Sequence, residues 1–104
     1  MIYRQGDVLL VTIRKTMSKN AKPVPRDRGR LVLAYGEVTG HAHAIDDVLA
    51  DLFEEHDGQM YLRVGTGGAT LRHEEHGVMP LVPGTYRVIR QREYAPGAIR
   101  RVAD

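Results

Sequence analysis

The 104-residue sequence contains no cysteine, and this absence excludes disulfide bonds and thiolate metal ligands. A reducing, cytoplasmic location is the simplest expectation for such a composition. No segment approaches the roughly 20 apolar residues that a membrane-spanning helix needs. The apolar run at residues 8–13 is also too short for a signal peptide and lacks a small-residue cleavage site. We therefore expect a soluble protein without a membrane partner.

Aromatic residues are also scarce, because Trp is absent, Phe occurs once and five Tyr are spread along the chain. Proteins that bind single-stranded nucleic acid commonly stack the bases on a set of aromatic side chains. The sequence pI of about 9.2 and the basic ends of the chain favour a nucleic-acid partner. The missing stacking set makes this partner the less favoured hypothesis.

Charge is distributed unevenly although the net charge is only +2. Residues 1–36 contain eight basic and two acidic side chains, residues 37–75 two basic and nine acidic, and residues 76–104 five basic and two acidic. The three segments thus have formal charges of +6, −7 and +3. The acidic middle attracts cations. All five histidines lie in it or directly beside it: His41, His43, His56, His73 and His76.

Short runs rich in Val, Leu, Ile and Tyr, separated by Gly, Pro and Asp, predict an all-β protein. The predicted strands cover residues 7–15, 30–35, 41–45, 51–56, 59–64, 69–73 and 86–94. Residues 18–29 predict a loop, 45–50 an irregular or one-turn helical stretch, and 82–85 a type II turn. Asp57-Gly58 predicts a hairpin turn, and Pro96 opens a predicted short C-terminal helix. We expect one domain over residues 1–104, a small β-barrel or sandwich with that helix at its end.

His41 and His43 form a His-x-His pair within a predicted strand. Residues two apart project from the same face of a strand, so the Cβ atoms of the pair would lie about 6.5–7 Å apart. Both imidazoles could then bind one ion with metal–nitrogen distances of about 2.0–2.1 Å. The alternative is two solvent-exposed histidines, and the pair by itself does not decide between the two.

A second pair, His73 and His76, encloses the sequence His-Glu-Glu-His. If the strand continues, His73 and Glu75 share the inward face that Ala69 and Leu71 define. A buried histidine needs a partner because an unpaired polar group is costly, and the partner can be the backbone, Glu75 or a metal ion. The zinc-protease motif is excluded, since it places two histidines four residues apart on a helix.

We predict that the two pairs meet in one divalent-metal site with four ligands: His41, His43, His73 and His76. Nitrogen-rich ligation with nearby carboxylates suits Zn, Fe, Mn, Ni or Cu. The candidate oxygen ligands or general bases are Glu37, Asp46, Asp47 and Glu75. Among these, Glu75 and Glu37 are the predicted catalytic residues, acting as general base.

The sequence His41-Ala-His43 followed by Asp47 is similar to the first motif of the cupin family, in which two histidines precede a carboxylate on strands of a small barrel. Pro83-Gly84 is similar to part of that family's second motif, but the histidine expected after it is missing. Asp also replaces Glu, and the glycine spacings differ. The resemblance implies a cupin-like barrel with a metal held by three residues and a later histidine: His41, His43 and Asp47, with His73 or His76.

Most of the chain resembles a type of small, uncharacterised bacterial and phage protein. The segments that support this are YRQGDV, GEVTGHAHAI, LRHEEH and YRVIRQREY. This resemblance implies no established activity.

The preferred hypothesis is a metal-binding small β-barrel protein that acts as a metal-dependent enzyme on a small-molecule ligand of unknown identity. One alternative is a metal-binding module without chemistry. Another is a nucleic-acid-binding or protein-binding module that uses the basic ends. A homodimer is compatible with a small barrel that covers an open edge by pairing, but the sequence does not require one.

Overall fold

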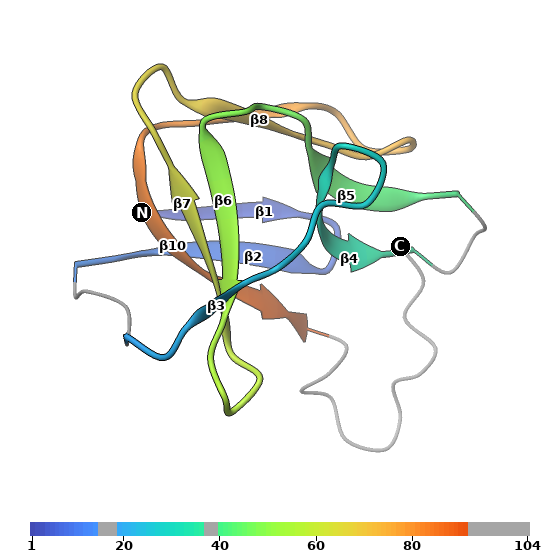
Figure 1. The fold of residues 1–104 in the computed structure, drawn as a ribbon. Helices are drawn as coiled ribbons and strands as arrows, with labels where there is room; N and C mark the ends of the chain where they lie inside the picture. The colour runs from blue at the N-terminus through green and yellow to red at the C-terminus, as the bar shows by residue number, and fades with distance from the viewer. Residues whose placement is uncertain (15–18, 37–39, 92–104) are drawn as a thin grey trace.

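The computed structural model describes residues 1–14, 19–36 and 40–91, and within these ranges the chain forms β-strands and no α-helix (Figure 1). The strands are β1 (Ile2–Gln5), β2 (Val8–Ile13), β3 (Lys22–Pro23), β4 (Leu31–Tyr35), β5 (Ala42–Ile45), β6 (Ala50–Glu54), β7 (Met60–Val64), β8 (Ala69–Arg72), β9 (Met79–Leu81) and β10 (Gly84–Arg90). The prediction of an all-β protein is therefore confirmed. The predicted C-terminal helix lies outside the described residues.

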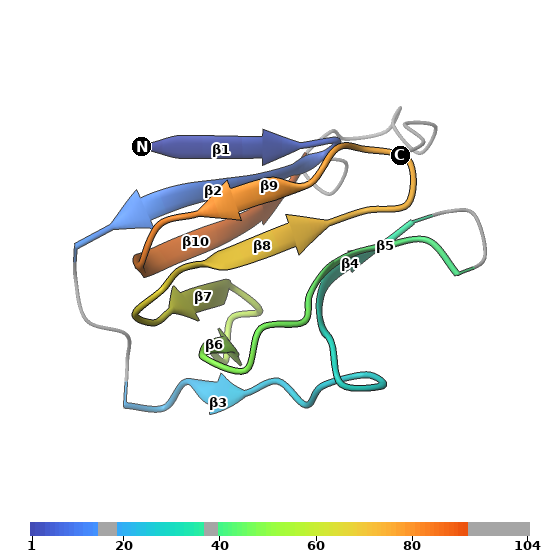
Figure 2. The ribbon, with the colours of Figure 1, turned by 90° about the horizontal axis from the view of Figure 1, so that it is seen from above.

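The strands form two open antiparallel sheets rather than a closed barrel. One sheet has the strand order β1-β2-β10-β7-β6-β3, and the other has the order β4-β5-β8-β9. In Figure 1, β8 lies above β1, β2 and β10, and the view from above in Figure 2 shows β8 and β9 lying over β2 and β10. The two sheets thus stack against each other. Within the described segments, no helix is long and apolar enough to cross a membrane.

The core lies between the sheets because each strand alternates inward and outward side chains. In β2, Val8 and Leu10 are fully buried, whereas Thr12 is exposed. The buried cluster takes apolar side chains from both sheets, among them Leu33 and Ile45 from one and Leu62 and Tyr86 from the other. The β5 strand directs Ile45 into this core and therefore directs His43, two residues earlier, toward the same side.

The hairpin predicted at Asp57-Gly58 is confirmed, since β6 pairs with β7 and Gly58 has a φ of 88°. Of the two alternatives predicted for residues 45–50, the irregular stretch is present and the helical turn is not: β5 ends at Ile45, a turn follows, and β6 begins at Ala50. The apolar side chains of Val48 and Leu49 are exposed there, so they do not form the core-facing side of a helix.

The predicted type II turn at residues 82–85 is wrong, because Gly84 has a φ of 151° and already begins β10. A type II turn needs a φ near +80° at this position. Three short strands were not predicted: β1, β3 and β9. They depend on their partners, as in β3, where Lys22 and Pro23 pair with Glu54 and Phe53.

Candidate metal centre

Antiparallel pairing of β5 with β8 brings the two histidine pairs together. Ala44 lies opposite Arg72 in this pairing, so the residues that precede and follow them, His43 and His73, are neighbours at the same sheet end. His41 immediately precedes β5, and His76 lies in the connection from β8 to β9. The predicted meeting of the two pairs is therefore present in the structure.

The four imidazoles form one continuous cluster with His73 at its centre. The ring centroid of His73 lies 4.4 Å from that of His43, 4.6 Å from that of His76 and 5.7 Å from that of His41. The rings of His43 and His76 are stacked, with centroids 5.7 Å apart. His43 is fully buried and His73 is 6% exposed, so the cluster extends into the protein rather than lying on its surface.

Two overlapping groups have ligand atoms that all lie within 4.8 Å of one another. The inner group is His43, His73 and His76, and the outer group is His41, His73 and Glu74. Each group offers three protein ligands, the number that catalytic metal sites use when a fourth position stays open. The sequence predicted all four histidines of these groups but not Glu74.

Gln5 determines which nitrogen of His43 is available to a cation. Its amide Nε2 donates to the backbone oxygens of Leu71, at 3.1 Å, and Gly77, at 2.9 Å. Those two acceptors fix the amide so that Oε1 faces His43 Nδ1 at 2.9 Å, and Nδ1 must be the donor. The proton of the neutral ring is then on Nδ1, so Nε2 is the ring nitrogen that could bind a metal ion. Metal-binding histidines commonly have this type of supporting acceptor.

Asp7 adds a buried carboxylate beside that nitrogen. It lies between β1 and β2, is only 5% exposed, and its Oδ1 is 3.7 Å from His43 Nε2. A cation held at His43 Nε2 would place a positive charge close to this carboxylate.

His73 has a different hydrogen-bond arrangement. Its Nδ1 accepts the backbone N–H of Glu75 at 3.0 Å, which leaves the proton of the neutral ring on Nε2. Nε2 is buried and has no hydrogen-bond partner in the described part of the chain. A buried donor without a partner costs about 1–3 kcal/mol. Metal binding through Nε2 removes this penalty, but it requires the proton to leave Nε2.

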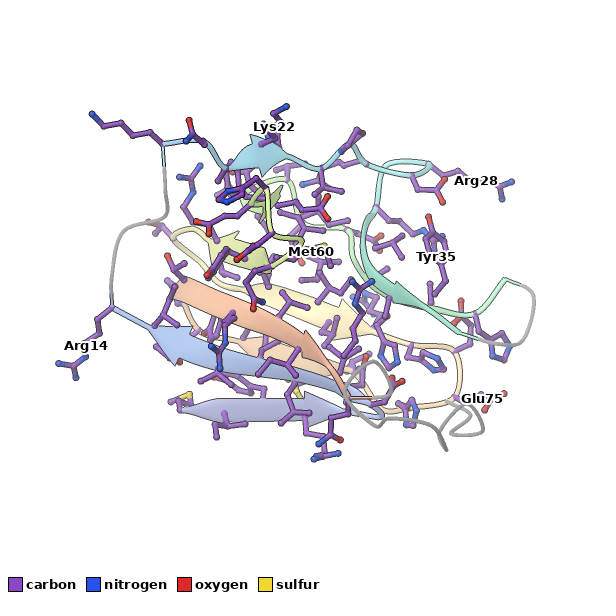
Figure 3. The ribbon with its side chains drawn as sticks, turned by 90° about the horizontal axis from the view of Figure 1, so that it is seen from below. Arg14, Lys22, Arg28, Tyr35, Met60 and Glu75 are labelled. Atoms are coloured by element: carbon purple, nitrogen blue, oxygen red, sulfur yellow. The ribbon has the colours of Figure 1, made fainter. Side chains whose placement is uncertain are left out.

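The carboxylates predicted from sequence take different positions. Glu75 is exposed at the margin of the molecule (Figure 3), and its Oε2 lies 3.3 Å from His41 Nδ1. The strand ends at Arg72, so the predicted inward direction of Glu75 is wrong. Asp46 faces Arg72, with 3.8 Å between its Oδ2 and Nε, and Asp47 accepts the N–H of Thr70 at 2.9 Å. Glu37 lies outside the described residues.

Glu74, which was not predicted from the sequence, is an exposed carboxylate that lies beside His41 and His73. Its Oε1 accepts the N–H of Ala42 at 2.9 Å. Backbone hydrogen bonds from Ala42 and from Glu74 itself lower the pKa of Glu74, and His41 and His73 act in the same direction. Its carboxylate therefore stays ionised at neutral pH, as a metal ligand must.

The ligand set implied by the cupin resemblance is only partly assembled. His41 and His43 both adjoin His73. Asp47 belongs to neither ligand group, and its carboxylate accepts a hydrogen bond from the backbone N–H of Thr70. Asp7 and Gln5 replace it as polar neighbours of His43. The only sequence signal for them is the Gln-Gly-Asp turn in YRQGDV, and the long-range pairing that brings it to His43 is not visible in the sequence.

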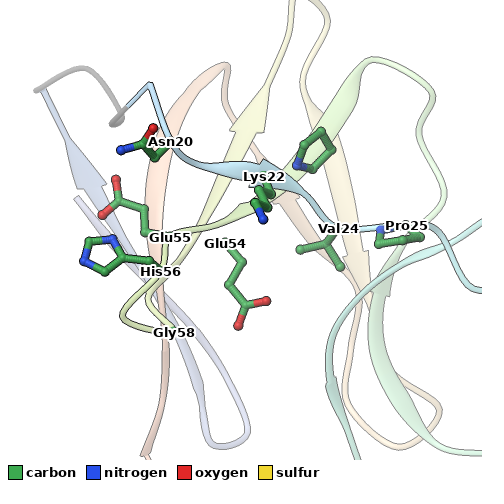
Figure 4. Close-up of a pocket in the computed structure, with 9 residues that line it drawn as sticks. Asn20, Lys22, Val24, Pro25, Glu54, Glu55, His56 and Gly58 are labelled. Atoms are coloured by element: carbon green, nitrogen blue, oxygen red, sulfur yellow. The ribbon is translucent and has the colours of Figure 1, made fainter.

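Two cavities adjoin the cluster. One, of about 310 Å³, is lined in part by Ala42, His73 and Glu74, and the other, of about 250 Å³, is lined in part by Tyr35 and His41. A larger cavity of about 500 Å³ lies between β3 and the β6–β7 hairpin, where Lys22, Glu54, Glu55 and His56 surround it (Figure 4). None of the four clustered histidines lines this third cavity, so His56 is separate from the candidate metal centre.

The chain belongs to a protein family described as a domain of unknown function (DUF8820), whose model matches residues 4–91. This match confirms the resemblance to a small uncharacterised family and spans Gln5, Asp7 and all four clustered histidines. Neither the curated proteins nor the solved structures include a match to this chain.

Proposed function

We propose that this protein binds one divalent transition-metal ion through His43, His73 and His76 and uses it as a metal-dependent enzyme. The observation that supports this most directly is the geometry of the inner group, whose three imidazoles come from two segments and offer nitrogens within 4.8 Å of one another. Imidazole ligands suit Zn, Fe, Ni and Cu, and nearby carboxylates extend the range to Mn.

The surroundings of His43 are compatible with a metal ligand. Its Nδ1 is bound to Gln5, the kind of supporting acceptor that metal-binding histidines commonly have, and its Nε2 faces the Asp7 carboxylate at 3.7 Å. That separation is longer than a hydrogen bond but allows a cation to contact both atoms. Three histidine ligands leave one position open for water or substrate, so the ion could polarise a substrate or activate water.

The test is elemental analysis of protein purified without a histidine tag, followed by thermal unfolding with added Zn, Ni, Mn or Fe. We expect about one equivalent of metal. At a free metal concentration about 100 times Kd, binding should stabilise the fold by about 2.7 kcal/mol and raise Tm by roughly 10–20 °C. Metal-free protein whose Tm ignores all four ions would refute the proposal.

Matched variants locate the site. His43→Gln and His76→Ala should each abolish the metal-dependent rise in Tm, whereas His56→Ala should retain it because His56 is exposed and outside both ligand groups. Two variants are used because His43 is fully buried and its replacement also perturbs packing. An unchanged metal response in both variants would exclude the inner group as the site.

A further inference from the structure

The 310 Å³ cavity beside the cluster lies on the outer side of the four-stranded sheet. Ile45 of β5 points into the core, so Ala42 and Ala44 face the opposite way and form part of the cavity wall. Val78 adds a further apolar side chain. His73 and Glu74 line the same cavity, which connects it to both ligand groups of the candidate metal centre.

Two arginines line the cavity, and one of them, Arg30, can bind an anion. Arg30 and Arg72 both line it, together with the carboxylates of Asp46 and Glu74. Both carboxylates have partners, since Asp46 lies 3.8 Å from Arg72 Nε and Glu74 accepts the N–H of Ala42. The side chain of Arg30 has no ion pair or hydrogen bond in the described part of the chain and is half-buried. Its guanidinium is therefore available to a ligand.

We infer that this cavity binds a small monocarboxylate with a short apolar body as the substrate of the proposed metal centre. Arg30, supported by Arg72, binds the carboxylate, because a guanidinium matches its two oxygens. The apolar body lies against Ala42, Ala44 and Val78, and the rest of the molecule reaches His73 and Glu74. The volume of about 310 Å³ is at the small end of ligand pockets, which range over about 300–1,000 Å³.

Charge favours a monoanion over a phosphate. Asp46 and Glu74 share the cavity with the two arginines, so the four side chains carry no net formal charge. The two carboxylates would repel a dianion more strongly than a monoanion, and a monocarboxylate with a neutral, apolar remainder needs only the guanidinium of Arg30, with Arg72 beside it, to balance its single charge. The inference rests on the proposed function for its chemistry, but the binding step can be measured separately.

The experiment titrates ¹⁵N-labelled protein, metal-free and zinc-loaded, with isovalerate, with its uncharged analogue isovaleramide and with inorganic phosphate. Isovalerate should shift the amide signals of residues 42–46 and 72–78 in the zinc-loaded protein. Isovaleramide and phosphate should bind at least tenfold more weakly. Arg30→Gln should weaken isovalerate binding at least fivefold, whereas Arg87→Gln, exposed on β10, should leave it unchanged.

The outcomes separate the two proposals. Equal binding of isovaleramide, tighter binding of phosphate, or shifts elsewhere in the protein would overturn the assignment of a monocarboxylate pocket. Zinc binding without any isovalerate response would also overturn it and would leave the metal centre in place. Isovalerate binding by a protein that takes up no metal would support the pocket and refute the metal-dependent enzyme.

Discussion

Gln5 is the residue through which the proposed metal centre can be tested without changing a ligand. It is 3% exposed and makes three hydrogen bonds: to the oxygens of Leu71 and Gly77 and to His43 Nδ1. Replacing it by Met keeps a similar length and removes all three. Each partner that is left buried without a hydrogen bond costs about 1–3 kcal/mol, and water at the edge of the site reduces that cost. We expect Gln5→Met to lower the free energy of unfolding of the metal-free protein by roughly 2–4 kcal/mol.

The same substitution should weaken metal binding by a separate route. Without Oε1, nothing holds the proton of His43 on Nδ1 or fixes the orientation of the ring. Loss of such a supporting group typically lowers metal affinity about 10–100-fold. Gln5→Glu keeps an acceptor for Nδ1 and should retain more of the affinity, although it loses the donor to Leu71 and Gly77.

The assay measures zinc affinity by competition with a chromophoric chelator, at a temperature where urea titration shows each variant to be fully folded. Gln59→Met is the matched control, because Gln59 also donates from its side chain to a backbone oxygen, that of Val88 at 3.2 Å, but is outside the cluster. Wild-type zinc affinity in folded Gln5→Met would refute the role of Gln5 and the His43 tautomer inferred from it.

Three further substitutions test the fold. Leu62→Ala should destabilise the protein by about 2–5 kcal/mol in urea titration, because Leu62 is fully buried in the shared core; a loss below 1 kcal/mol would contradict that placement. Gly68→Ala should cost at least about 2 kcal/mol, since Gly68 has a φ of 79° and an added Cβ would lie 2.6 Å from the Leu81 oxygen, whereas Gly77→Ala meets no atom within 4 Å and should be much milder. Burial, with Tyr3 nearby, raises the pKa of Tyr86 to about 12, so the protonated phenol stabilises the fold fully below pH 10 and this contribution is lost as pH rises toward 12. Tyr86→Phe, followed by urea titration from pH 9 to 12, should therefore lose less stability with rising pH than wild type, and identical slopes would contradict the raised pKa.

The fold was predictable where a strand has its own apolar pattern. Residues 8–13, 31–35 and 60–64 consist mostly of apolar and aromatic residues, and all three are strands. Lys22-Pro23 and Met79–Leu81 have no such pattern and become strands only through pairing with β6 and β8. Local sequence cannot reveal such strands, because the hydrogen bonds that define them come from residues far away in the chain.

The site shows the same division between local and long-range information. Histidine spacing predicted the four imidazoles, because two close pairs in an all-β chain can meet on adjacent strands. Gln5 and Asp7 could not be selected, since each has an ordinary position in a turn-forming segment until β1 and β2 are packed beside β5 and β8. Glu75 was assigned an inward direction and Glu74 was not selected, because the strand ends at Arg72 and the alternation that the prediction assumed stops there.

Asp7 determines which kind of metal site this cluster can be. If its carboxylate, 3.7 Å from His43 Nε2, joins the three histidines of the inner group, the ion has four protein ligands and the site is closed, as in structural centres. If it stays unbound, the fourth position would be open and the Asp7 carboxylate would be placed to act as a general base beside it. Two features favour the open form: the outer group offers a second set of ligands on the side of the 310 Å³ cavity, and His73 belongs to both groups. A closed structural site would need neither the cavity nor the unpaired Arg30 side chain beside it, and this is why we propose a catalytic rather than a structural ion.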